Sequence, residues 1–161
     1  MKIPPGTEVV AEGNKISVIG KRGKLERNFG VKGAIIESKS GEIVVSCNIL
    51  RLANTIEAHI ANMLKGASEG FEFTMHAVYS HFPLSFEVKG KNLLIKNFLG
   101  EKNPRVAAMI GDTKIEVKGQ DITISGPSKE DVGQTVSNIK HATRISKRDS
   151  RVFQDGLYIV E

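Results

Sequence analysis

The sequence predicts an α+β fold made of two tandem copies of one small unit, each with a mostly antiparallel sheet and one packed helix. Three observations lead to this prediction. Apolar residues alternate with a period of two over several short segments, a helical stripe of apolar residues occurs in each half, and turn residues recur at matching positions. We therefore expect an N-terminal repeat over residues 1–80 and a C-terminal repeat over residues 81–161.

Two hairpins are expected in the first half. Residues 8–20 alternate loosely between apolar and polar side chains on both sides of a Gly13-Asn14 turn, which is the pattern of an antiparallel hairpin. Residues 34–49 repeat this pattern around Ser40-Gly41. The period of two in the second hairpin places three apolar side chains on one face, those of Ile43, Val45 and Cys47.

The period becomes helical after residue 50. Apolar side chains recur at helical spacing at Leu52, Ile56, Ile60, Met63 and Leu64. A glycine, either Gly66 or Gly70, is expected to end this helix. Strand alternation then returns over residues 71–79, which we assign to the first repeat.

After residue 79 the same order of signals starts again. At one constant offset, Gly13, Ile16, Val18 and Gly23 correspond to Gly90, Leu93, Ile95 and Gly100. The second hairpin recurs around Ile115, Gly119 and Ile122, and the helical stripe recurs as Val132, Val136 and Ile139. Both halves are therefore expected to share one order of strands and helix.

The repeats differ most in the connection from the helix to the last strand, which is longer in the second copy by about seven to ten residues. The added segment is basic, because only one acid, Asp149, occurs between residues 140 and 151. The residues there that suit phosphates or unstacked bases are Lys140, His141, Arg144, Lys147, Arg148, Arg151 and Phe153. We predict an RNA-binding loop, with an ordinary solvated loop as the alternative.

A second candidate segment, residues 97–105, is rich in turn residues. Its glycine and proline are expected to expose Lys96, Lys102 and Arg105, with Asn97 beside them. This segment belongs to the same repeat as the basic connection, so we expect the two to share one binding surface. An ordinary β turn is the alternative.

Composition favours a polyanionic partner. The net charge is +5 and the isoelectric point is about 9.4, and nucleic acid is the leading partner for such a balance. The single cysteine, Cys47, can form no internal disulfide, which fits a reducing compartment such as the cytoplasm. No apolar run is long enough to span a bilayer, so the favoured hypothesis includes no membrane partner, and an acidic membrane surface ranks behind nucleic acid.

No motif argues for catalysis. The sequence lacks a phosphate-binding Gly-x-x-x-x-Gly-Lys-Ser/Thr loop, and its four histidines are not placed at metal-ligand spacing. The Gly20-Lys21-Arg22-Gly23 segment matches the Gly-x-x-Gly loop of KH domains, but strand-like sequence before it favours a basic hairpin turn. We therefore expect no catalytic residue, metal, cofactor or small-molecule substrate.

Several segments together resemble the ribosomal protein L six family in its archaeal and eukaryotic branch, called L nine in eukaryotes. They are Ile60-Ala61-Asn62-Met63, Gly70-Phe71, Tyr79-Ser80-His81-Phe82-Pro83, Asn97-Phe98-Leu99-Gly100-Glu101-Lys102, Gly133-Gln134-Thr135 and Arg151-Val152-Phe153-Gln154-Asp155-Gly156-Leu157-Tyr158. The resemblance implies a large-subunit ribosomal protein of two similar α+β domains. It also implies that the second domain is the chief binder of large-subunit rRNA, close to the sarcin-ricin loop and the stalk base.

These observations favour a non-catalytic structural protein of the large ribosomal subunit, located on the ribosome in the cytoplasm. Its expected partners are large-subunit rRNA and neighbouring large-subunit ribosomal proteins. Two alternatives stay open at this point. One is an RNA-processing enzyme that uses dispersed acids with His141 or His81, and the other is a peripheral module that binds acidic protein or lipid through the same cations.

Overall fold

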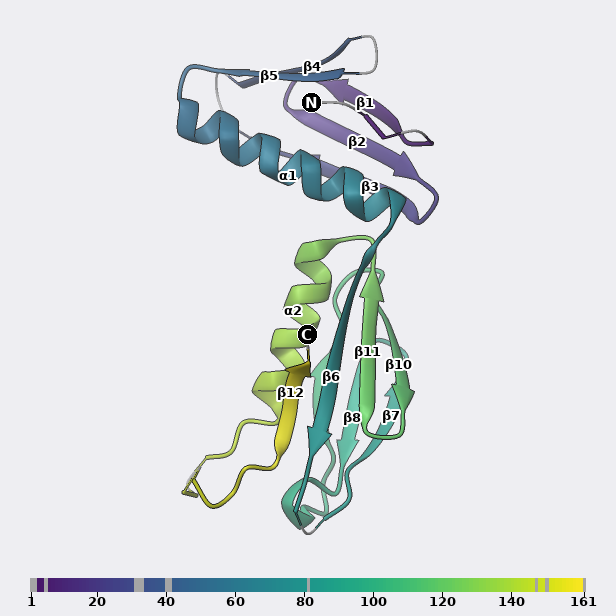
Figure 1. The fold of residues 1–161 in the computed structure, drawn as a ribbon, viewed down its shortest axis with the longest axis vertical. Helices are drawn as coiled ribbons and strands as arrows, with labels where there is room; N and C mark the ends of the chain where they lie inside the picture. Colours follow the sequence, from purple (N-terminus) through teal and green to yellow (C-terminus); the bar gives the residue numbers. More distant parts are fainter. Residues whose placement is uncertain are drawn as a thin grey trace. The chain divides into compact units, whose positions relative to one another are not determined.

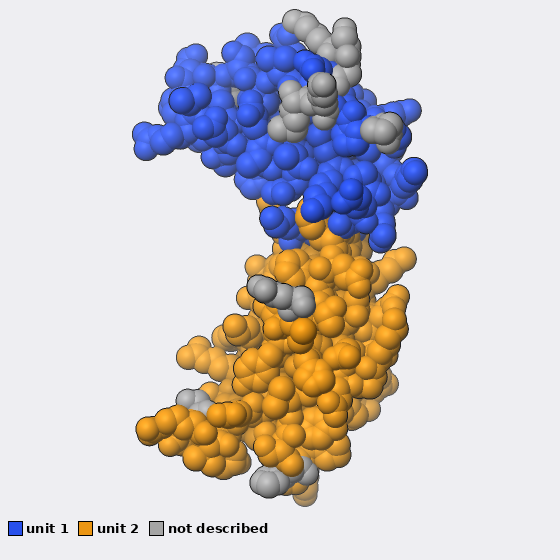
Figure 2. All heavy atoms as spheres, in the orientation of Figure 1, with its two compact units in different colours: residues 1–70, 127–129 blue, residues 71–126, 130–161 orange. Residues whose placement is uncertain are grey.

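The computed structural model divides the chain into two compact units, which Figure 2 draws in different colours. Unit 1 comprises Met1–Gly70 and Pro127–Lys129, and unit 2 comprises Phe71–Gly126 and Glu130–Glu161. Within these bounds the structure describes residues 3–4, 6–30, 34–39, 42–80, 82–146, 148–149 and 151–160. One long α-helix accompanies antiparallel strands in each unit (Figure 1), which confirms the predicted α+β class.

Unit 1 consists of two antiparallel sheets and a helix, α1 (Leu50–Ser68). The first sheet has the order β1-β2-β3 and is formed by β1 (Glu8–Glu12), β2 (Lys15–Gly20) and β3 (Gly23–Asn28). The second is a hairpin of β4 (Ala34–Lys39) and β5 (Glu42–Cys47). Both predicted hairpins are confirmed, and Gly13 adopts a φ of +61° in the first turn. The second turn, at residues 40 and 41, lies outside the described residues.

α1 buries four of the five predicted stripe residues in the core of unit 1, while the fifth, Leu52, is only half-buried. The residues of that core are Ile16, Val18, Ile36, Ile43, Ile56, Ile60, Met63, Leu64 and Ala67. The helix continues through a buried Gly66 and ends at Ser68. Gly70 follows with a φ of +83°, the left-handed conformation that commonly ends a helix at a glycine. Of the two expected stops, the structure therefore selects Gly70.

Unit 2 encloses its core between two sheets and one helix, α2 (Lys129–Ala142). The three-stranded sheet has the order β7-β8-β9, with β7 (Ser85–Lys89), β8 (Asn92–Lys96) and β9 (Arg105–Ala108). A short 3-10 helix, η1 (Phe98–Gly100), lies between β8 and β9. The four-stranded sheet has the order β10-β11-β6-β12, with β6 (Phe71–Val78), β10 (Lys114–Lys118), β11 (Asp121–Gly126) and β12 (Gly156–Val160).

The internal repeat is visible in the cores of the two units. Ile16 and Val18 on β2 have relative exposures of 0%, as do their counterparts Leu93 and Ile95 on β8. Their hairpin turns also match, because Gly90 adopts a φ of +59° at the position equivalent to Gly13. The second apolar stripe is buried as predicted, through Val132, Val136 and Ile139 of α2.

Strand β6 lies in unit 2, although the sequence pattern assigned residues 71–79 to the first repeat. It pairs antiparallel with β11 on one side and with β12 on the other. β6 and β12 are the equivalent last strands of the two repeats, and unit 2 contains both. The compact units therefore divide after Gly70 rather than near residue 80, because the pairing partners of β6 are strands of the second unit.

Candidate nucleic-acid interface

The basic segment begins where α2 ends. The last turn of this helix carries Lys140 and His141, both exposed, next to the fully buried Ile139. Thr143 closes the helix, since its backbone N–H and its hydroxyl both donate to the carbonyl of Ile139 at 3.1 Å. The N–H of Arg144 then donates to the carbonyl of His141 at 3.1 Å. The helix end therefore fixes the first residues of the connection.

The connection from α2 to β12 spans residues 143–155, whereas only residues 69–70 join α1 to β6. The predicted difference between the repeats is thus present and slightly larger than expected. Part of this difference in length arises because α2 has 14 residues and α1 has 19. The helix of the second repeat therefore ends earlier than that of the first. Lys147, one of the predicted contacts, lies outside the described residues.

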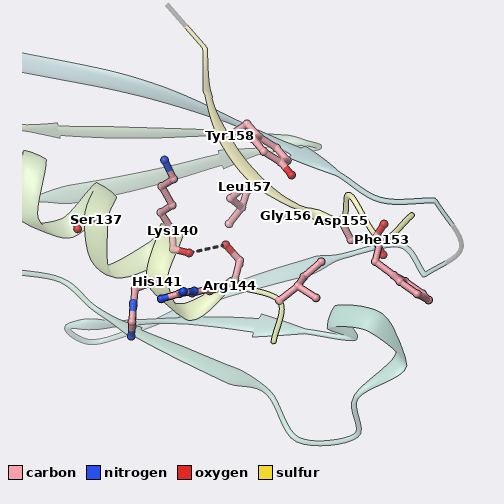
Figure 3. A pocket seen from close by; sticks show the side chains of 11 residues that line it. Ser137, Lys140, His141, Arg144, Phe153, Asp155, Gly156, Leu157 and Tyr158 are labelled. Atoms are coloured by element: carbon pink, nitrogen blue, oxygen red, sulfur yellow. Dashed lines mark hydrogen bonds between the residues drawn. The ribbon is translucent and has the colours of Figure 1, made fainter. Parts of the chain in front are cut away.

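A groove of about 470 Å³ lies between the end of α2 and the returning chain. Figure 3 shows Lys140, His141 and Arg144 at the helix end of this groove, and Phe153, Asp155 and Tyr158 on the returning chain. Ile145 and Leu157 add apolar side chains to its lining. The arrangement offers positive charge and apolar surface within one hollow.

The returning chain is anchored at the start of β12. Asp155 has a relative exposure of 7%, and its Oδ1 accepts a hydrogen bond from the Ser80 N–H at 3.2 Å. Leu157 is buried in the core and pairs with Ala77 of β6. The hydroxyl of Tyr158 donates to the Gln154 carbonyl at 2.9 Å. No sequence pattern indicates Asp155 as a site residue, because an acid before a strand has no local signal of burial.

The middle of the connection turns around Asp149. Its carbonyl accepts hydrogen bonds from the N–H groups of Val152 and Phe153 at 3.1 and 3.0 Å. The Arg148 guanidinium carbon lies 4.9 Å from the centroid of the half-buried Phe153 ring. The Arg151 side chain is 90% exposed and contacts the Asp149 carboxylate at 3.3 Å. Two cations thus stand on the solvent side of a turn that the backbone stabilises.

Arg105 has a different environment from the one predicted. Its side chain is only 22% exposed, and its Nε and Nη2 donate to the two carboxylate oxygens of Glu101 at 2.8 and 2.6 Å. Its Nη1 donates to the carbonyls of Ala142 and Arg144 at 2.9 and 3.0 Å. The guanidinium carbon also lies 4.2 Å from the centroid of the Phe98 ring. All three guanidinium nitrogens therefore have partners within the chain.

The other residues of the second candidate segment are partly engaged. Lys96 pairs with Glu87 at 2.6 Å and remains 49% exposed. The Asn97 side-chain amide donates to the carbonyl of Pro83 at 3.0 Å, while Lys102 is exposed. Hydrogen bonding to Arg105, aided by the charges of Arg105 and Arg148, lowers the pKa of the Glu101 carboxyl against the opposing effect of burial. The hydrogen bonds from Arg105 to the carbonyls of Ala142 and Arg144 show that the two candidate segments adjoin.

The described part of the chain contains no group of three or more His, Cys, Asp or Glu residues that could hold a metal ion. Neither α-helix in that part has both the length and the apolar run needed to cross a bilayer. The Gly20 to Gly23 segment is the turn between paired strands β2 and β3, as the sequence predicted, rather than a loop between two helices.

Comparison with known proteins identifies the family. The family model described as ribosomal protein L6 matches residues 82–156, which include both candidate segments. The large ribosomal subunit protein uL6 of Methanosarcina mazei is 45% identical over 100% of this chain and 94% of its own length. The uL6 proteins of Methanobrevibacter smithii and Natronomonas pharaonis are 40% and 39% identical, over 99% and 100% of this chain and 93% and 94% of theirs.

The chain belongs to the uL6 family. Membership confirms the resemblance to the archaeal branch and gives a structural, non-enzymatic role in the large ribosomal subunit. The predicted location on the cytoplasmic ribosome follows from the same membership. Among the alternatives, an RNA-processing enzyme does not agree with this family.

Proposed function

We propose that this uL6 protein binds large-subunit rRNA through the basic connection of unit 2, in the region of the sarcin-ricin loop and the stalk base. One observation supports RNA contact above all: the long connection occurs only in the second repeat, and its described cations are exposed. A segment added to one copy of a repeat is not needed to build the shared fold, so its charges point to a partner.

The chemistry of the groove suits RNA. Lys140 and Arg144 can neutralise phosphates, and Arg148 and Arg151 extend the positive surface along the connection. The apolar part of the groove, which includes Phe153, offers a surface against which an unpaired base can pack. Neighbouring large-subunit proteins are the second class of partner that we propose.

Salt dependence tests the electrostatic part of the proposal. The five predicted cations are Lys140, Arg144, Lys147, Arg148 and Arg151. If most of them each neutralise one phosphate, log affinity for large-subunit rRNA should fall against log salt with a slope of roughly −3 to −4. Arg148→Ala should make this slope shallower by about one. Lys118→Ala, which removes an equal charge from the 76% exposed Lys118 on β10, is the matched control. A wild-type slope near −1 would contradict the proposal.

The location on the rRNA requires a separate measurement. Chemical probing of large-subunit rRNA with and without the protein should reveal protection at the sarcin-ricin loop and the stalk base. Protection confined to other helices would contradict this location while leaving RNA binding itself intact. Crosslinking within the assembled subunit would identify the neighbouring proteins.

A further inference from the structure

Arg105 connects the two candidate segments of unit 2. We propose that Arg105 is a positioning residue, which holds the start of the basic connection in place for RNA rather than contacting a phosphate itself. The inference rests on the proposed function, and it assigns Arg105 a role other than the one that its sequence context predicted.

The guanidinium group completes the end of α2. The last carbonyls of a helix have no partners within the helix, and Arg105 donates to the carbonyl of Ala142, the last residue of α2. It also donates to the carbonyl of Arg144, two residues beyond the helix. Its opposite edge donates to both oxygens of Glu101, and its face lies on Phe98. Only a planar fork with donors on several sides can make these contacts together, so lysine is a poor substitute.

The support beneath Arg105 is firmly held. Phe98 has a relative exposure of 1%, and Asn97 and Leu99 on either side adopt left-handed conformations with φ of 60° and 51°. Non-glycine residues keep such conformations only where their surroundings determine them. Leu99 packs against the core, and Asn97 bonds to Pro83. The turn therefore provides a fixed base from which Arg105 reaches residues 37 and 39 positions away.

The ion pair with Glu101 separates positioning from direct contact. In a direct contact, Glu101 competes with phosphate, so Glu101→Gln should tighten RNA binding by removing an acid. In the positioning role, Glu101 orients Arg105, so the same substitution should weaken RNA binding although the protein becomes more positive. The two roles thus predict opposite signs for one substitution.

The experiment compares full-length variants at one salt concentration. Glu101→Gln and Arg105→Lys should each weaken binding to large-subunit rRNA by about three- to tenfold, because hydrogen bonds to charged groups are lost. In the absence of RNA, both should accelerate hydrogen exchange of the Thr143 and Arg144 amides. Glu116→Gln on β10 makes the same charge change elsewhere in unit 2, and it should leave affinity within about twofold because Glu116 lies outside both candidate segments.

A purely structural role needs its own control. Ile124→Val removes one methylene from the buried core and should lower stability. Ile124 lies on β11, between β10 and β6 in the sheet, and so outside the connection. The Ile124→Val variant should leave RNA affinity unchanged at temperatures well below its melting point.

Tighter binding by Glu101→Gln would overturn the positioning role in favour of direct contact. Faster exchange in Arg105→Lys with unchanged affinity would also overturn it. Arg148→Ala distinguishes failure of the Arg105 role from failure of the proposed function. If the basic connection does not bind RNA, this variant should leave affinity for large-subunit rRNA unchanged.

Discussion

At the scale of single residues, Leu157 and Arg151 have opposite environments although they are close in sequence. Leu157 has a relative exposure of 2%, so Leu157→Ala should lower the free energy of unfolding by about 2 to 5 kcal/mol. The Arg151 side chain is 90% exposed, so Arg151→Ala should change the free energy of unfolding by under about 0.5 kcal/mol while weakening RNA binding. Denaturant titration and RNA binding of both variants test this. A large stability loss in Arg151→Ala would contradict the assignment.

Phe153 can either anchor the connection or stack on a base. The ring is half-buried, lines the groove and lies beneath Arg148. We expect anchoring, because a partly buried ring loses packing when it is removed, so Phe153→Ala should lower the melting temperature. Unchanged melting together with a loss of about 1 to 3 kcal/mol in RNA binding would indicate base stacking instead.

Glu101 gives stability a dependence on acid. Its pKa is lowered in the folded protein, chiefly by the hydrogen bond from Arg105. The stabilisation is therefore complete above the unfolded-state pKa and is lost as pH falls through the folded-state pKa. Below about pH 5, wild type should lose unfolding free energy more steeply than Glu101→Gln. The same dependence in both proteins would contradict this coupling. The pKa of Glu26 is lowered to about 2 by hydrogen bonds from Lys24 and Lys15. Glu26 therefore makes the free energy of unfolding depend on acid pH equally in wild type and in Glu101→Gln.

At the scale of elements, a glycine allows β2 and α1 to approach closely in unit 1. A Cβ at Gly20 would lie 2.8 Å from that of Ala67 and collide with the Ala67 carbonyl. Gly20→Ala should therefore cost about 1 to 3 kcal/mol of stability. Gly133 in α2 is the matched control, because nothing lies within 4 Å of a Cβ there. Gly133→Ala should stabilise by about 0.5 to 1 kcal/mol, and thermal melting distinguishes the two signs.

The helices and hairpins are largely predictable from the sequence, but the strands with which a given strand pairs are not. A period of two or of 3.6 specifies which face of a segment is buried, and it correctly gave the hairpins and both helical stripes. The same period does not specify which strand a segment pairs with. The pattern of residues 71–79 therefore predicts a strand of the first repeat, but it does not indicate that this strand pairs with β11 and β12 in unit 2.

The candidate interface is likewise predictable only where a local sequence signal exists. The exposed cations at the end of α2 were recognisable from charge and from the length difference between the repeats. Arg105 was not, because its exposure depends on carbonyls that the fold brings from residues 142 and 144. The one local signal was Glu101, four residues before Arg105, which is a spacing that permits an ion pair. That signal alone could not indicate that the remaining donors would be occupied as well.

At the scale of the whole molecule, β6 determines where the chain can be divided. It is an inner strand of the four-stranded sheet, and β12 has β6 as its neighbour in that sheet. Met75 and Ala77 on β6 are buried in the core of unit 2. A fragment that begins at residue 81 lacks this strand, so it loses part of the core and the pairing partner of β12. A fragment that begins at residue 71 retains both.

We therefore expect residues 71–161 to fold and to bind large-subunit rRNA much better than residues 1–70. Residues 81–161 should melt at a markedly lower temperature or fail to fold, and should bind weakly although they contain every cation of the basic connection. The reason is that RNA binding requires those cations at fixed positions, and Leu157 is fixed by pairing with Ala77 of β6. Circular dichroism melting and RNA titration of the three fragments test this. Equal stability and affinity of the 71–161 and 81–161 fragments would show that β6 is dispensable for the interface.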